Sequence, residues 1–63
     1  MILKIKHIGG YYVNSNFTDF KTEPGQVTVY SPSFDGPVET VIPAWREIQI
    51  IDDHGNVIDT IKK

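Results

Sequence analysis

The chain has 63 residues, which is enough for one domain spanning residues 1–63 and too few for two lobes with a cleft between them. It contains no cysteine, so neither disulfides nor thiolate metal sites reinforce its small core. A hydrophobic fraction of 40% is typical of a folded globular chain, and a formal net charge of -2 gives no general attraction to polyanions.

The amino terminus predicts neither a signal peptide nor a membrane span. Lys4 and Lys6 interrupt the apolar run that begins at Met1, so the run is too short for either segment. We therefore expect a cytoplasmic protein that does not bind a membrane.

The first half of the chain predicts two hairpins. Residues 2–8 form a strand in which isoleucine and leucine alternate with two lysines, and residues 11–13 return after a Gly-Gly turn. Residues 17–22 fit either a strand or a single helical turn, and we prefer the strand. The Pro-Gly pair at 24–25 is typical of a type II turn, which would pair that strand with residues 27–30.

The second half predicts a loop, a short strand and a further hairpin. Residues 31–37 contain two prolines and a glycine, so they form a loop that exposes Phe34. Residues 38–42 form a strand that ends at a turn around Pro43. Residues 46–52 and 57–62 predict the clearest hairpin, in which two alternating strands flank an Asp-His-Gly-Asn turn.

Together these segments predict an all-β fold of five to six strands in consecutive hairpins. We expect a small antiparallel barrel or curled sheet, SH3-like or OB-like, with a strand-paired dimer as the alternative. Closure of a barrel would place the first and last strands side by side. An open sheet would expose its edges, so we also expect a homodimer or a higher oligomer.

The sequence does not predict a catalytic centre. His7 alternates with apolar residues, which favours a partly buried strand position over a ligand or base. His54 lies in an acidic turn that lacks the spacing of a calcium loop, so local hydrogen bonding is the better explanation of its aspartates. We predict no enzyme activity, no cofactor and no metal site.

Aromatic residues are the strongest sign of a binding surface. The seven aromatic side chains exceed what so small a core can hold, and adjacent strand residues such as Tyr11 and Tyr12 point to opposite sides. Phe34 lies in a loop, and Trp45 follows a proline at a strand end. We predict partner contacts at Tyr11, Tyr12, Phe34 and Trp45, and we also expect Trp45 to be at least half buried, in the core or in a subunit contact.

Four lysines indicate a second candidate binding surface, which would be basic. If the first and last strands are neighbours, Lys4, Lys6, Lys62 and Lys63 form one basic patch beside the tyrosines, which is the minimum needed to bind a short single strand of nucleic acid. A solvated face of mixed charge is the simpler interpretation of these lysines.

These observations favour a non-enzymatic interaction module that binds a protein partner, or itself, through an edge strand and an aromatic patch. Small regulators or inhibitors of the kind that phages and mobile elements encode fit this description. The alternative is a small β-barrel that binds single-stranded nucleic acid.

Overall fold

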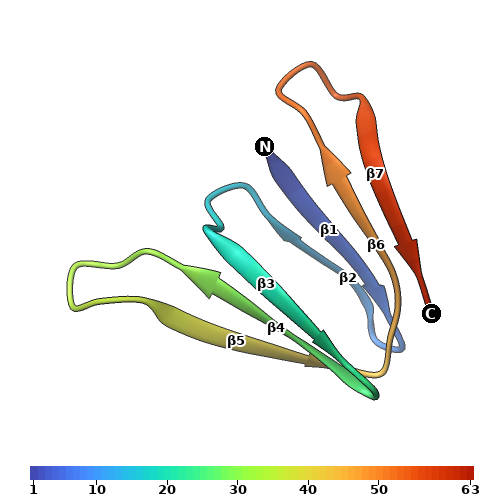
Figure 1. Ribbon diagram of the computed structural model, residues 1–63, viewed down its shortest axis with the longest axis horizontal. Coiled ribbons are helices and arrows are strands. Elements are labelled where there is room, and N and C mark those ends of the chain that lie inside the picture. The colour runs from blue at the N-terminus through green and yellow to red at the C-terminus, as the bar shows by residue number, and fades with distance from the viewer.

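Seven β-strands and no helix make up the computed structural model, which describes all residues 1–63 (Figure 1). The strands are β1 (Ile2–His7), β2 (Gly10–Asn14), β3 (Asp19–Glu23), β4 (Gln26–Ser31), β5 (Val38–Pro43), β6 (Trp45–Ile51) and β7 (Val57–Lys62). They form two antiparallel sheets: sheet A in the order β2-β1-β6-β7, and sheet B in the order β3-β4-β5. The predicted all-β class is confirmed, and no helix is present that could cross a membrane.

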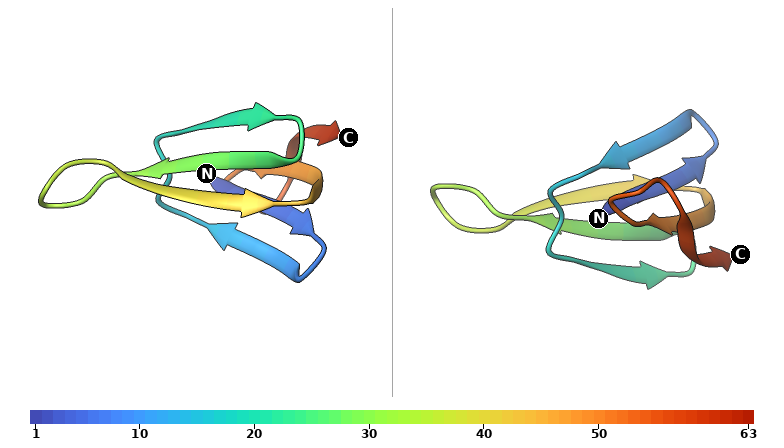
Figure 2. Two further views of the ribbon diagram at one scale, coloured as in Figure 1. Left: turned by 90° about the horizontal axis from the view of Figure 1, so that it is seen from below. Right: turned by 90° about the horizontal axis from the view of Figure 1, so that it is seen from above.

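The two sheets face each other across one core and diverge like a V. Figure 1 shows them edge-on, close together where β5 joins β6 and farther apart towards the β6–β7 and β4–β5 loops. Figure 2 shows the β2–β3 connection crossing from one sheet to the other at the wider end. Phe17 in this connection packs against the core, so the crossing segment helps to cover the wider end.

The sheets do not close into the predicted barrel. β1 pairs with β2 and β6, and β7 pairs only with β6, so the first and last strands are not neighbours. There are seven strands instead of five or six, and the β2–β3 and β5–β6 connections pass between the sheets instead of forming hairpins. The prediction was wrong on these points because strand order depends on contacts between distant segments, which local patterns do not reveal.

The chain changes direction at two residues that have a positive φ, Gly25 and Ala44. Gly25 has φ of 91°, the left-handed value that a type II turn requires at its third position, and β3 and β4 pair across this turn. Ala44 has φ of 53° and forms the corner between β5 and β6. The predicted turn around Pro43 is thus reduced to one residue, and β6 begins directly at Trp45.

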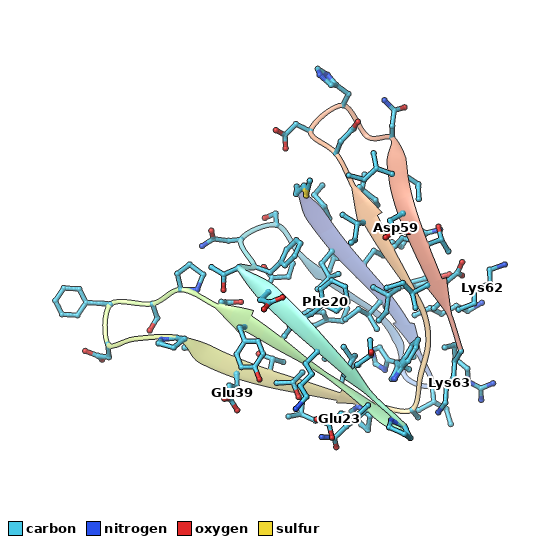
Figure 3. The ribbon with its side chains drawn as sticks, viewed as in Figure 1. Phe20, Glu23, Glu39, Asp59, Lys62 and Lys63 are labelled. Atoms are coloured by element: carbon cyan, nitrogen blue, oxygen red, sulfur yellow. The ribbon has the colours of Figure 1, made fainter.

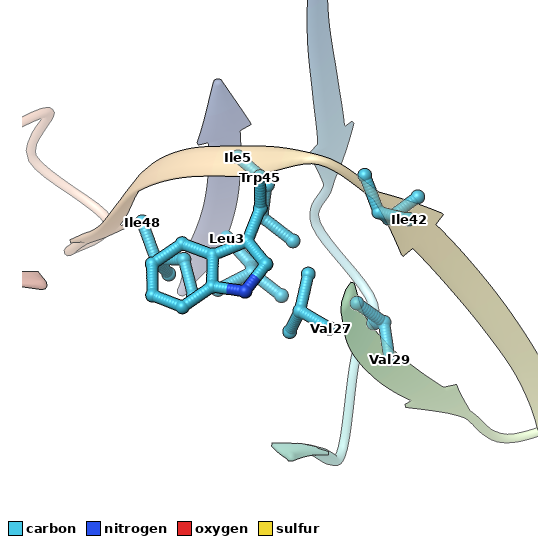
Figure 4. Close-up of a cluster of buried hydrophobic side chains, with 7 residues drawn as sticks. All are labelled: Leu3, Ile5, Val27, Val29, Ile42, Trp45 and Ile48. Carbon is cyan, nitrogen blue, oxygen red and sulfur yellow. The ribbon is translucent and has the colours of Figure 1, made fainter. Parts of the chain in front are cut away.

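The core contains seven buried apolar side chains drawn from both sheets (Figure 4). The central strands supply most of them, because their inward residues alternate with outward polar ones. The buried set is Leu3, Ile5, Val27, Val29, Ile42, Trp45 and Ile48. Every buried side-chain nitrogen or oxygen has a hydrogen-bond partner, so no polar side-chain atom is left uncompensated in the core.

Candidate functional site

The outward side of sheet A carries a basic surface. Leu3 and Ile5 point into the core, so the residues between and after them on β1 point to solvent. The strand register aligns Tyr11 of β2, Lys6 of β1, Glu47 of β6 and Lys62 of β7 in one row. The next row contains Val13, Lys4, Gln49 and Thr60. We call these two rows the basic face.

Tyr11 lies at the edge of the basic face, beside a shallow hollow. Its side chain is 60% exposed, and the Lys4 Nζ lies 4.6 Å from the centre of its ring, within the range of a cation–π contact. The hollow, of about 160 Å³, is lined by Lys4, Lys6, Tyr11, Glu47 and Gln49. Val13, two residues farther along β2, is 58% exposed, so this edge strand presents two apolar side chains on one side.

Tyr12 points the other way, as the alternation predicts. It is partly buried against the core, and its hydroxyl accepts a 2.9 Å hydrogen bond from the Asn14 side-chain amide. The same amide donates to the Ser31 hydroxyl at 2.8 Å. Tyr12 and Asn14 therefore connect sheet A to β4, and the Tyr12 ring is not part of the basic face.

Trp45 and Phe34 lie apart from the basic face and from each other. Trp45 is 6% exposed and belongs to the core, where its indole N–H donates to the Glu23 carbonyl at 3.1 Å. A hollow of about 330 Å³ next to it is lined by Ala44, Trp45, Arg46 and Lys63. Phe34 is fully exposed in the β4–β5 loop, at the far left of Figure 1, whereas the β1–β2 turn lies at the lower right. The structure does not bring the four predicted aromatic residues together.

Three of the four predicted lysines share the basic face. Lys4, Lys6 and Lys62 point outward, but β6 lies between β1 and β7 and places Glu47 between Lys6 and Lys62. Lys63 follows β7, and its backbone N–H donates to the Arg46 carbonyl at 3.1 Å. Three of the four lysines therefore lie on one face, although β1 and β7 are not neighbours as the prediction assumed.

Sheet B presents an acidic surface that the sequence analysis missed. Its outward residues alternate with the buried Val27 and Val29, so Tyr30 of β4 points outward between Asp19 of β3 and Glu39 of β5. The other outward residues include Lys21, Glu23 and the half-exposed Val41. We call this surface the acidic face. The alternation of Val27 and Val29 along β4 was the available signal, because it places Tyr30 on the opposite side of the strand. Only the pairing of β4 with β3 and β5 places the carboxylates of Asp19 and Glu39 beside Tyr30.

The histidines and the acidic turn have local roles. His7 Nδ1 accepts the Gly9 N–H at 3.2 Å. One carboxylate oxygen of Asp52 accepts the backbone N–H of both His54 and Asn56 at 2.9 Å. These hydrogen bonds, with that from Asn56 the largest cause, lower the pKa of Asp52. The turn therefore has the local hydrogen bonding predicted for it, and no three His, Cys, Asp or Glu residues are grouped as metal ligands would be.

Comparison with known proteins found no matching family model, no matching curated protein and no matching solved structure. Function is therefore inferred from the two faces and the strand edges of this chain.

Proposed function

We propose that this chain is a non-enzymatic interaction module that binds a protein through edge strand β2. The observation that carries the proposal is the exposure of Tyr11 and Val13 on one side of a strand that pairs with a single neighbour, β1. A partner strand that adds to an open edge gains backbone hydrogen bonds, and alternate side chains supply specificity. Such a module acts as a regulator or inhibitor by occupying a surface of a larger protein.

The chemistry of β2 supports this proposal. Tyrosine provides a large, rigid contact surface with a polar tip, which is why it is enriched at interfaces. Lys4 lies against one side of the Tyr11 ring and limits its freedom, so less conformational entropy is lost when a partner binds. The fully exposed Phe34 is a separate apolar contact, on a loop that reaches away from both sheets.

The test is capture of a partner from nuclease-treated lysate of the source cells by immobilised protein. The Tyr11→Ser/Val13→Ser variant is expected to lose the partner. Val57→Ser/Ile58→Ser is the matched control, since these side chains are 48% and 52% exposed on β7, the opposite edge of the same sheet. Circular dichroism is used to check that both variants fold. A partner that binds the β2 variant as well as the wild type would contradict the proposal.

Single-stranded nucleic acid binding is the second candidate, favoured by the grouping of Lys4, Lys6 and Lys62 beside Tyr11. Two observations weigh against it. Glu47 lies among the lysines, where its carboxylate repels a phosphate backbone, and Lys4 covers part of the ring on which a base would stack. Salt separates the two functions, because phosphate binding weakens steeply with salt and an apolar protein contact does not.

A further inference from the structure

The two outward faces of the molecule carry opposite charge. The basic face has three lysines and one glutamate, whereas the acidic face has three carboxylates and one lysine. In Figure 3, Glu23 and Glu39 lie on the outer side of sheet B, and Lys62 lies on the outer side of sheet A. Each molecule therefore presents a positive sheet and a negative sheet in opposite directions.

The charges on the two faces also have the same spacing. On the basic face, Lys6 and Lys62 lie two strands apart with Glu47 between them. On the acidic face, Asp19 and Glu39 lie two strands apart with Tyr30 between them. Neighbouring strands are about 4.8 Å apart in any sheet, so the outer residues of both rows are roughly 10 Å apart at Cα.

We propose that a second copy of this chain packs its acidic face against the basic face of the first. Each lysine of the row then meets one of the two carboxylates, whichever way the strands run, and the Tyr30 hydroxyl donates a hydrogen bond to Glu47. The contact joins two different surfaces, so the copy at each end of an assembly keeps one free face, and the assembly grows as a chain unless it closes into a ring. This inference goes beyond the proposed function, which uses the open edge of β2 and not the contact between the two faces.

The size of the faces determines the expected strength. The molecule measures 32 × 29 × 17 Å, and its shortest dimension lies along the viewing direction of Figure 1, across the strands. Such a face buries less than the roughly 1,200 Å² total of standard interfaces, which places the contact among weak, transient ones. We expect association in the micromolar range or weaker, decreasing as salt screens the ion pairs.

Sedimentation equilibrium of nucleic-acid-free protein over a wide concentration range, at low and at high salt, measures this association. The basic-face variant Lys6→Gln/Lys62→Gln and the acidic-face variant Asp19→Asn/Glu39→Gln are each expected to associate at least about tenfold more weakly than the wild type. The control Asp35→Asn/Asp59→Asn removes two carboxylates from outside both rows and is expected to associate like the wild type. Circular dichroism is used to check the fold of each variant.

A mixture of the basic-face variant and the acidic-face variant tests most directly whether the two faces bind each other. Each retains one intact face, so the mixture is expected to form a one-to-one dimer that does not grow, because the remaining faces are the altered ones. A wild type that stays monomeric, variants that associate normally, or a mixture without dimer would each overturn the inference. Capture of a partner through Tyr11 and Val13 by a wild type that stays monomeric would overturn it while leaving the proposed function standing, since that binding needs no second copy of the chain.

Discussion

At the corner between β5 and β6, a single side chain joins the two sheets. Trp45 begins β6 in sheet A, and its indole N–H donates to the Glu23 carbonyl at the end of β3 in sheet B. It is also the largest side chain of the core and is 6% exposed. The corner and the core therefore depend on the same residue.

Trp45→Ala is expected to lower the free energy of unfolding by about 3 kcal/mol or more, because it removes buried contacts between the sheets and leaves a cavity. Trp45→Phe keeps most of the apolar bulk but leaves the Glu23 carbonyl without its donor, at a cost of about 1–2 kcal/mol. Urea titration followed by far-UV circular dichroism measures both. An unchanged midpoint for the alanine variant would show that the indole does not hold the sheets together, and Phe34→Ala, at an exposed position, serves as the control.

Ala44 is the only residue other than glycine with a positive φ. At 53° its Cβ crowds the backbone, a conformation that costs a non-glycine residue roughly 1–2 kcal/mol, and a β-branched side chain makes it worse. We therefore expect the free energy of unfolding of Ala44→Val to be at least about 1 kcal/mol lower than that of Ala44→Gly. Urea titration measures this difference. Equal stability of the two variants would show that the corner adopts another backbone conformation in solution.

Among the elements, the β6–β7 hairpin depends on the turn that joins its strands. β7 pairs only with β6, and most of its side chains are exposed, so little core packing holds it in place. The Asp52 carboxylate accepts two backbone N–H groups of the turn, which fixes its shape. One charged side chain therefore contributes to the shape of this turn, beside the backbone hydrogen bonds of the turn and of the strand ladder.

The pKa of Asp52 is lowered in the folded state, mainly because its carboxylate accepts the Asn56 N–H. A lowered pKa means that the stabilisation is fully present above the ordinary aspartate pKa of about 3.9 and is lost as the pH falls through the lower folded value. We expect the amides of β7 to lose protection from hydrogen exchange in that acidic range, as NMR at a series of pH values measures. The Asp52→Asn variant has no ionisable group at this position, so the loss of protection of the β7 amides in acid is expected to be absent. The same loss in the variant would show that Asp52 does not cause it.

The V-shaped pair of sheets distributes charge unevenly over the whole molecule. Sheet A and sheet B each have one face in the core, which leaves one outward face on each side. Although the chain has a net charge of only -2, the register concentrates lysines on one of these faces and carboxylates on the other. Association with charged partners is therefore determined by the face they meet and not by the net charge.

We expect no submicromolar binding to random single-stranded or duplex nucleic acid near physiological salt. Even if Lys4, Lys6, Lys62 and Lys63 all reached phosphates, neutralising about four of them gives a log–log salt slope near -3, too little for tight nonspecific binding. Fluorescence anisotropy with labelled oligonucleotides is the measurement. Tight binding that weakens steeply with salt and is lost in Lys4→Glu/Lys6→Glu would instead support the nucleic-acid alternative.

Features that depend on neighbouring residues could be predicted from the sequence. The last strand was predicted at its observed bounds, Val57–Lys62, and the turn at Pro24-Gly25 has the positive φ that its type requires. The opposite orientations of Tyr11 and Tyr12, and the burial of Trp45, also follow from alternation and size. Strand alternation and turn chemistry act over two to four residues, so they can be recognised directly in the sequence.

Which strands are neighbours, and therefore which side chains share a surface, became known only from the three-dimensional arrangement of the strands. The pairing of β1 with β6 places Glu47 among the lysines, and the pairing of β4 with β3 and β5 places two carboxylates around Tyr30. It also placed Trp45 in the core of a single chain instead of at a contact between subunits. These arrangements could not be predicted because strand order reflects the burial of apolar surface between distant segments, a global balance that no local pattern encodes.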